Sequence, residues 1–227
     1  MIPTLIYILM RRYKQRNPKG AEKFMLTIHK AGRLIILILV ATAISLRSSS
    51  QEKKLEYQVK RNGNVVGNVW FTQNLSGNRI TFKMESEVKT RLIFTFTAKA
   101  QEESIYDNGI LTWSSIYRKM NGTIKADKKM KAIGNAYTIY KDNKSETVNH
   151  YPIYYNMLSM YTIELTVFSK VYSDNFQQFL DIKTVNNHQY KIEFPDGNYN
   201  EYFYEKGICF KINIHHSLYS ASIELKS

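Results

Sequence analysis

The histidines and the single cysteine are the residues whose types could hold a metal ion. His215 and His216 are adjacent, and neighbouring side chains on a strand point to opposite faces, so the two cannot chelate one metal in regular geometry. Cys209 lies shortly before them, but no pair of these residues has the C-x-x-C or H-x-x-x-H spacing typical of a zinc site. We therefore expect structural histidines, and neither a metal site nor another cofactor.

Cys209 could also be considered as a nucleophile. A reactive thiol needs a neighbouring base and a lowered pKa, and nothing in the local sequence supplies either. The residue stands between Ile208 and Phe210 in an alternating stretch, where a lone cysteine behaves as a small apolar side chain. We predict a core position for it.

Four side chains could supply an acid–base set with a serine nucleophile: His188, Glu193, Asp196 and Ser173. Their local sequence contains no nucleophile elbow and no triad signature. Asp196-Gly197 fits a hairpin turn, and His188 fits the first residue of a strand, so both have a simpler structural use. We predict no catalytic residue.

Aromatic residues point to binding more clearly than any polar cluster does. The chain has 17 Tyr, 11 Phe and 2 Trp, most of which we expect in a core. The segment Tyr151–Tyr161 holds more large side chains than one short loop usually buries, and enrichment in aromatic residues and Met is typical of binding surfaces. The predicted ligand-binding residues are Phe96, Trp113, Tyr154, Tyr155 and Met157.

From Gln51 onward, apolar residues alternate with polar ones. Such a period of two places one face of a strand on a core and the other in water, as in antiparallel sheets. The alternating runs include 55–59, 80–86, 92–98, 190–194, 208–214 and 223–225.

Turn signals separate these runs. Dipeptides such as Asn62-Gly63 and Asn121-Gly122 tolerate the positive φ of tight hairpins. One segment, from Ile153 to Met160, is compatible with a helical turn, with Pro152 at its first position. We predict an all-β antiparallel meander of about ten or more strands, curved into a closed or half-open barrel with one short helical insertion. Residues 51–227 contain no linker and should form a single domain.

The positive charge of the chain is concentrated at its beginning. The formal charge is +13, from 32 basic and 19 acidic residues. Nine of the basic residues and one acidic residue lie in 1–50, which leaves 23 basic and 18 acidic residues in 51–227. This mild excess argues against a nucleic-acid partner. The lysine runs 53–54 and 125–131 are most simply solvated or guard a sheet edge, with contact to anionic lipid headgroups as an alternative.

Residues 25–50 have the composition of a secretory signal peptide. Basic residues precede the apolar stretch 34–46, and small residues follow it up to Ser50. We expect cleavage before Gln51 and export to the periplasm or outer envelope. The alternative is an uncleaved segment that anchors the protein in the inner membrane. Residues 1–24 do not fit a signal peptide, and we expect translation to start at Met25 rather than Met1.

Several stretches resemble a family of secreted Bacteroidota-type proteins of unknown function. The resemblance rests on the opening strand and turn, 55–67, and on later stretches at 171–180, 188–190 and 194–208. These motifs are turns, aromatic residues and strand starts. The resemblance implies an exported antiparallel β protein and no particular activity.

Three functions are compatible with the sequence. The favoured one is a non-enzymatic binder or carrier of an apolar or amphipathic ligand, such as a lipid, in the cell envelope, with peripheral membrane contact as an accompanying expectation. The second is an interaction module for an envelope protein that uses Tyr151–Tyr161. The third is a hydrolase acting on envelope material, for which His188 and Asp196 would be the first candidates.

Overall fold

The computed structural model describes residues 51–91 and 95–226, and the side chain of Arg91 is not described. The predictions for 1–24, for the signal-like segment 25–50 and for 92–94 fall outside these residues. Within 51–91 and 95–226, no helix has the length and apolar character needed to span a bilayer.

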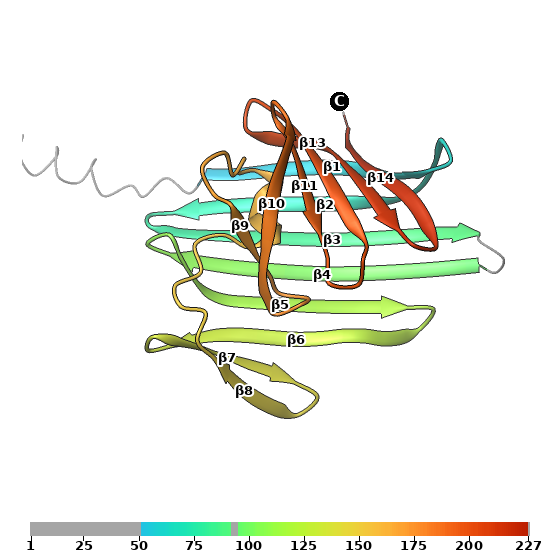
Figure 1. The fold of residues 1–227 in the computed structure, drawn as a ribbon. Helices are drawn as coiled ribbons and strands as arrows, with labels where there is room; N and C mark the ends of the chain where they lie inside the picture. The colour runs from blue at the N-terminus through green and yellow to red at the C-terminus, as the bar shows by residue number, and fades with distance from the viewer. Residues whose placement is uncertain (1–50, 92–94, 227) are drawn as a thin grey trace, which may run out of the picture. The chain divides into compact units, whose positions relative to one another are not determined.

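Fourteen strands and one short 3-10 helix make up the described chain (Figure 1). The first eight strands follow one another with short turns: β1 (Gln51–Arg61), β2 (Asn64–Ser76), β3 (Arg79–Arg91), β4 (Thr95–Asp107), β5 (Ile110–Met120), β6 (Thr123–Ile133), β7 (Ala136–Lys141) and β8 (Lys144–Val148). The second part begins with the helix: η1 (Met157–Tyr161), β9 (Lys170–Ser173), β10 (Gln178–Asn186), β11 (Gln189–Glu193), β12 (Tyr199–Glu205), β13 (Ile208–His216) and β14 (Tyr219–Leu225).

All fourteen strands belong to one antiparallel sheet. Strands that are consecutive in the chain pair with each other, except β8 and β9. In addition, β1 pairs with β14, through Tyr57 opposite Leu225 and Val59 opposite Ile223. The two edges of the sheet are therefore β8 and β9, which are consecutive in the chain. The sheet curls so that β10–β14 cross in front of β1–β5, with η1 between them (Figure 1). The predicted all-β meander is confirmed, in its half-open form.

Most of the predicted turn dipeptides connect strands. At Asn108-Gly109 both residues have positive φ, of 51° and 77°, which is the conformation of a tight hairpin turn and which an Asn-Gly pair adopts at little steric cost. Asp142 and Asn143 form a comparable turn between β7 and β8 that contains no glycine. His188 also has positive φ and lies in the turn before β11, so its predicted place as the first residue of that strand is wrong by one position.

The helical insertion is shorter than the segment predicted from Ile153 to Met160. It begins at Met157, because Asn156 caps it: the Asn156 side chain accepts a hydrogen bond from the Ser159 backbone N–H. Pro152 therefore does not occupy its first position. Leu158, Met160 and Tyr161 are buried.

The core lies between the two parts of the curled sheet, around η1. The Tyr161 ring stacks on Phe71 from β2 and meets Tyr57 from β1 edge-on. Tyr57 also donates a hydrogen bond to the carbonyl oxygen of Cys209, at 2.9 Å. Cys209 is fully buried, as predicted, and burial raises the pKa of its thiol to about 12.

Candidate functional site

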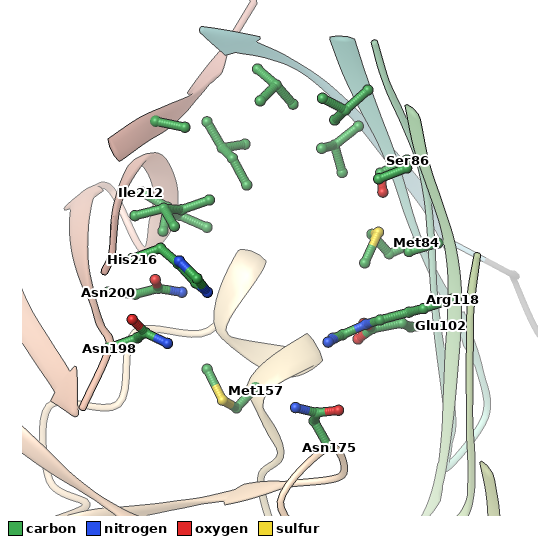
Figure 2. A pocket seen from close by; sticks show the side chains of 18 of the residues that line it. Met84, Ser86, Glu102, Arg118, Met157, Asn175, Asn198, Asn200, Ile212 and His216 are labelled. Atoms are coloured by element: carbon green, nitrogen blue, oxygen red, sulfur yellow. The ribbon is translucent and has the colours of Figure 1, made fainter. Parts of the chain in front are cut away.

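A cavity of about 460 Å³ lies between the β1–β5 part of the sheet and strands β12–β14 (Figure 2). This volume is within the range of small-molecule sites in proteins. Met157 of η1 and Asn175 of the β9–β10 loop lie at its floor. The cavity exists because the sheet folds over without closing, and η1 fills only part of the space between the two layers.

The wall of the cavity near the paired strands β1 and β14 is aliphatic. Alternate residues of each strand point inward, and those facing this part are Val59, Val66, Val69, Val88, Ile212, Ile214, Ala221 and Ile223. Several of them are only partly buried, because they face the cavity rather than another side chain. This part of the cavity suits a hydrocarbon chain.

An ion pair lies on the β4–β5 part of the cavity wall, on the same side as Met84 and Ser86 (Figure 2). Arg118 of β5 donates from Nη2 to Oε1 of Glu102 on β4, at 2.6 Å, and from Nε to the same oxygen at 3.2 Å. The Glu102 side chain is 14% exposed and the Arg118 side chain 39% exposed, and both residues line the cavity. The Glu102 charge raises the pKa of Arg118 above its ordinary value. The pair offers polar atoms at almost no net charge.

Asp174 lies beside this pair, in the loop between β9 and β10. Its carboxylate accepts hydrogen bonds from Ser114 Oγ at 2.5 Å and from Asn156 Nδ2 at 2.7 Å. Burial raises the pKa of Asp174 to about 6, against these two hydrogen bonds, and the nearby charge of Glu102 adds to the rise. Asp174 therefore gains a proton much more readily than an exposed aspartate does.

Asn156 fixes the position of η1 and of the Asp174 loop together. It is fully buried, and its Nδ2 donates to Ser104 Oγ at 2.6 Å as well as to Asp174. Its Oδ1 accepts from the Tyr106 hydroxyl at 2.9 Å, and that hydroxyl accepts from the Asn156 backbone N–H. The cavity floor is thus held by a hydrogen-bond network that satisfies both ends of the amide.

Three further polar side chains reach the cavity from the β12–β13 side (Figure 2): Asn198, Asn200 and His216. His216 Nδ1 accepts a hydrogen bond from the Leu218 backbone N–H, so a neutral His216 carries its proton on Nε2. Asn198 Oδ1 accepts from the Ser217 N–H, at 2.8 Å. Both residues can therefore offer a nitrogen donor to a bound group.

The structure brings two of the five predicted ligand-binding residues to the cavity, namely Phe96 and Met157. Trp113 does not line it. Thr112 is an extra residue on β5, since Ile105 pairs with Trp113 and Tyr106 pairs with Leu111. This bulge shifts the inward positions to Ser114 and Ile116, which leaves Trp113 on the other face.

Tyr154 and Tyr155 also lie away from the cavity. Tyr154 is 52% exposed, and the Tyr155 ring contacts Phe168 with 4.5 Å between centroids. The rest of the segment Tyr151–Tyr161 faces largely inward, with Ile153 fully buried. The surface that remains exposed consists of Tyr154 with Val167 and Phe168 of the following loop.

The residues considered as an acid–base set, His188, Glu193, Asp196 and Ser173, have different surroundings. His188 Nδ1 is 2.9 Å from Glu164 Oε1, and Glu193 pairs with Lys183. Ser173 and Asp196 line the cavity. Across 51–91 and 95–226, no three His, Cys, Asp or Glu side chains form a group that could hold a metal ion.

The chain matches the model of one protein family. The model of a domain of unknown function, DUF6134, matches residues 57–226. The chain belongs to the DUF6134 family. This confirms the predicted membership of a family of unknown function, while the Bacteroidota-type, secreted origin stays a prediction.

One solved structure with a similar course of the chain is the beta-barrel-like protein of the domain of unknown function DUF1849 from Brucella abortus. It is 10% identical to the DUF6134 chain, with a TM-score of 0.47, and the match covers 77% of this chain and 95% of that one. No curated protein matches the chain.

The sequence reasoning missed Glu102, Arg118, Asp174 and Asn156. Glu102 and Arg118 lie sixteen positions apart, and only the β4–β5 register, which pairs Glu102 with Ile116 and Ala100 with Arg118, makes them neighbours. A charged residue at an inward position of an alternating strand was the available signal for Arg118. Asn156 and Asp174 lie in irregular segments, where the sequence pattern carries no such signal.

Proposed function

We propose that this DUF6134 protein binds a single-chain amphipathic molecule, such as a lipid with one acyl chain, and acts as its carrier without transforming it. The observation that carries the proposal is the two-sided lining of the cavity of about 460 Å³. Aliphatic residues of β1, β2, β13 and β14 would hold the hydrocarbon chain. The polar group would meet Arg118, Asn198 and His216.

The charges favour a neutral, oxygen-rich polar group. Glu102 compensates Arg118, and Asp174 adds negative charge when it is ionised, so an anionic group would gain little from Arg118. Asn198 and His216 can donate hydrogen bonds to hydroxyl or ester oxygens. A monoacylglycerol has this chemistry.

Calorimetric titration with monolaurin, a glycerol monoester, tests the proposal. Ala221 lines the cavity on β14, whereas the adjacent Ser220 is exposed on the other face of the same strand. Ala221→Trp should fill the cavity and abolish binding, and the matched control Ser220→Trp should leave it unchanged. If a folded Ala221→Trp protein still binds monolaurin, the ligand does not bind in the cavity.

The ligand should also show head-group preference. Monolaurin should bind more tightly than laurate, which has a similar chain and a carboxylate. Equal or tighter binding of laurate would contradict the charge argument while leaving a hydrocarbon site in place.

The proposal takes the protein to be exported and to act in the periplasm or outer envelope. The support is the signal-like sequence of residues 25–50. Intact mass spectrometry of the C-terminally tagged protein from its own cells tests this. A mass that starts at Gln51 is expected, and a mass that includes residues 25–50 would instead support a membrane anchor.

An interaction module is the second candidate, because Tyr154 and, further along the chain, Val167 and Phe168 are exposed apolar side chains. Tyr154→Ser with Phe168→Ser should then abolish capture of an envelope partner without changing monolaurin binding. Capture unaffected by both changes would dispose of this candidate.

A further inference from the structure

The cavity extends to one end of the meander, which we call the turn end. It is formed by the β1–β2 turn at Asn62-Gly63, the β5–β6 turn at Asn121-Gly122 and the β13–β14 turn at Ser217-Leu218. Because β1 pairs antiparallel with β14 and successive turns alternate between the two ends, these three turns share an end. The residues that flank them line the cavity: Arg61, Met120, His216 and Tyr219.

Apolar side chains project at each of these turns. Val65, just after the β1–β2 turn, is 52% exposed, and Ile124, just after the β5–β6 turn, is 55% exposed. Leu218, in the β13–β14 turn, is 79% exposed. Large apolar side chains exposed at several turns of one end are typical of an interaction surface, here one that could insert into another apolar phase.

The same end carries exposed lysines. Lys89 of β3, Lys119 of β5 and Lys125 of β6 are all exposed. Glu87 lies near them, but it is paired with Lys99 at 2.5 Å. Asp196, on the β11–β12 loop, and the exposed Asp127, two positions after Lys125, also lie at this end, and the lysines outnumber them. The turn end is therefore positively charged as well as apolar.

We propose that the turn end docks on an anionic lipid bilayer, so that the ligand passes directly between membrane and cavity. The proposal rests on the proposed function, since it names the source of the amphipathic ligand. Val65, Ile124 and Leu218 enter the headgroup region, and the lysines are attracted by anionic lipids. The observation that selects a bilayer over a protein partner is the combination of apolar tips, excess lysine and the end of a partly aliphatic cavity at one place.

Co-sedimentation with vesicles tests the docking surface. The protein is expressed from the full-length gene and purified through a C-terminal tag, with or without residues 1–50 according to how the cells process it. Vesicles contain phosphatidylcholine alone or phosphatidylcholine with phosphatidylglycerol. The turn-end variant combines Lys89→Gln and Lys125→Gln, two exposed lysines that do not line the cavity. The control combines Lys53→Gln and Lys206→Gln, which removes the same charge elsewhere.

The turn-end variant should bind anionic vesicles roughly 25-fold more weakly, at about fivefold per lysine, and the control should bind like the wild type. Leu218→Ser alone should also weaken binding. Residues 1–50, where the protein retains them, are identical in all variants, so they cannot produce the difference. Equal binding of the turn-end variant and the wild type would overturn the proposal, and would leave the turn end to a protein partner.

A titration without vesicles separates this proposal from the proposed function. The turn-end variant should still bind monolaurin, because Lys89 and Lys125 do not line the cavity. A wild type that binds anionic vesicles but not monolaurin would keep the docking surface and reject the carrier function. A wild type that binds monolaurin but shows no preference for anionic vesicles would do the reverse.

Discussion

Arg118 donates two hydrogen bonds to Glu102 across the β4–β5 pairing, the shorter at 2.6 Å, and the pair lies on the wall of the cavity. A charged pair on a largely apolar wall is stable only while both partners are present, because either charge alone would be poorly solvated.

Removing Arg118 should therefore cost more than removing the pair. Arg118→Met leaves the Glu102 carboxylate without its partner and should lower the free energy of unfolding by about 1–3 kcal/mol. Adding Glu102→Gln should recover part of this loss. Urea unfolding of the two single variants and the double variant measures the coupling. If the effects of the two single variants sum to the effect of the double variant, the interaction between Arg118 and Glu102 contributes nothing to stability.

Asp174 should make stability depend on pH. Its pKa is about 6 in the folded protein and near 3.8 when unfolded, so its contribution is fully present below about pH 4 and is lost as the pH rises through 6. From pH 4 to pH 7, the free energy of unfolding of the wild type, relative to Asp174→Asn, should fall by about 3 kcal/mol at most.

The difference between the two proteins isolates Asp174. Asp107, Glu193 and Glu224 have lowered pKa values and act in the opposite direction, but they are present in both proteins. The asparagine of Asp174→Asn has one acceptor oxygen where the carboxylate offers one each to Ser114 and Asn156, and this adds an offset that does not vary with pH. Parallel stability curves from pH 4 to pH 7 would contradict the raised pKa.

Asn156 should be among the most sensitive polar positions. Asn156→Ala removes the side-chain hydrogen bonds to Tyr106, Ser104 and Asp174, three partners that lie in or beside the core. The Tyr106 hydroxyl then keeps only the Asn156 backbone N–H, and Asp174 keeps Ser114. We expect a loss of about 3 kcal/mol or more in thermal or urea unfolding. The control is Asn64→Ala, at an exposed asparagine, and should change stability by less than about 0.5 kcal/mol. Similar effects of the two substitutions would mean that the network does not hold the cavity floor.

Gly67 lets β2 and β3 approach each other closely. A Cβ atom at this position would lie 2.2 Å from the Glu87 carbonyl oxygen and 2.8 Å from Val88 Cα, both of them backbone atoms. Gly67→Ala should therefore destabilise the protein by roughly 1–3 kcal/mol. Asn68→Ala, at the next position, is the control. A Gly67→Ala protein as stable as the wild type would show that the two strands can separate locally without cost.

The sequence predicts the architecture of this protein better than its site. Alternation and dipeptides such as Asn108-Gly109 depend on neighbouring residues, so the meander could be recognised from them. The pairing of β1 with β14 joins residues more than 150 positions apart, such as Tyr57 and Leu225, and alternation carries no information on it. Whether the barrel closes depends on the same distant contacts.

The site depends on which strands face each other across the fold. Phe96 and Met157 were found because aromatic and Met side chains are conspicuous. Trp113 shows the limit of that reasoning, since the bulge at Thr112 changes which face each later β5 residue occupies. Asp174, in the loop after β9, contacts Asn156 at the start of η1, eighteen positions earlier. No local sequence pattern predicts such a contact between two irregular segments.

The affinity for monoacylglycerols of increasing chain length, measured by calorimetry below their aggregation concentrations, tests the proposed ligand binding most directly. If the aliphatic wall formed by β1, β2, β13 and β14 holds the chain, affinity should rise about fourfold with each added methylene until the cavity is full, and then level off. Ala221→Trp should remove this dependence and Ser220→Trp should keep it. An affinity that does not change with chain length, or no binding at any length, would contradict the central claim.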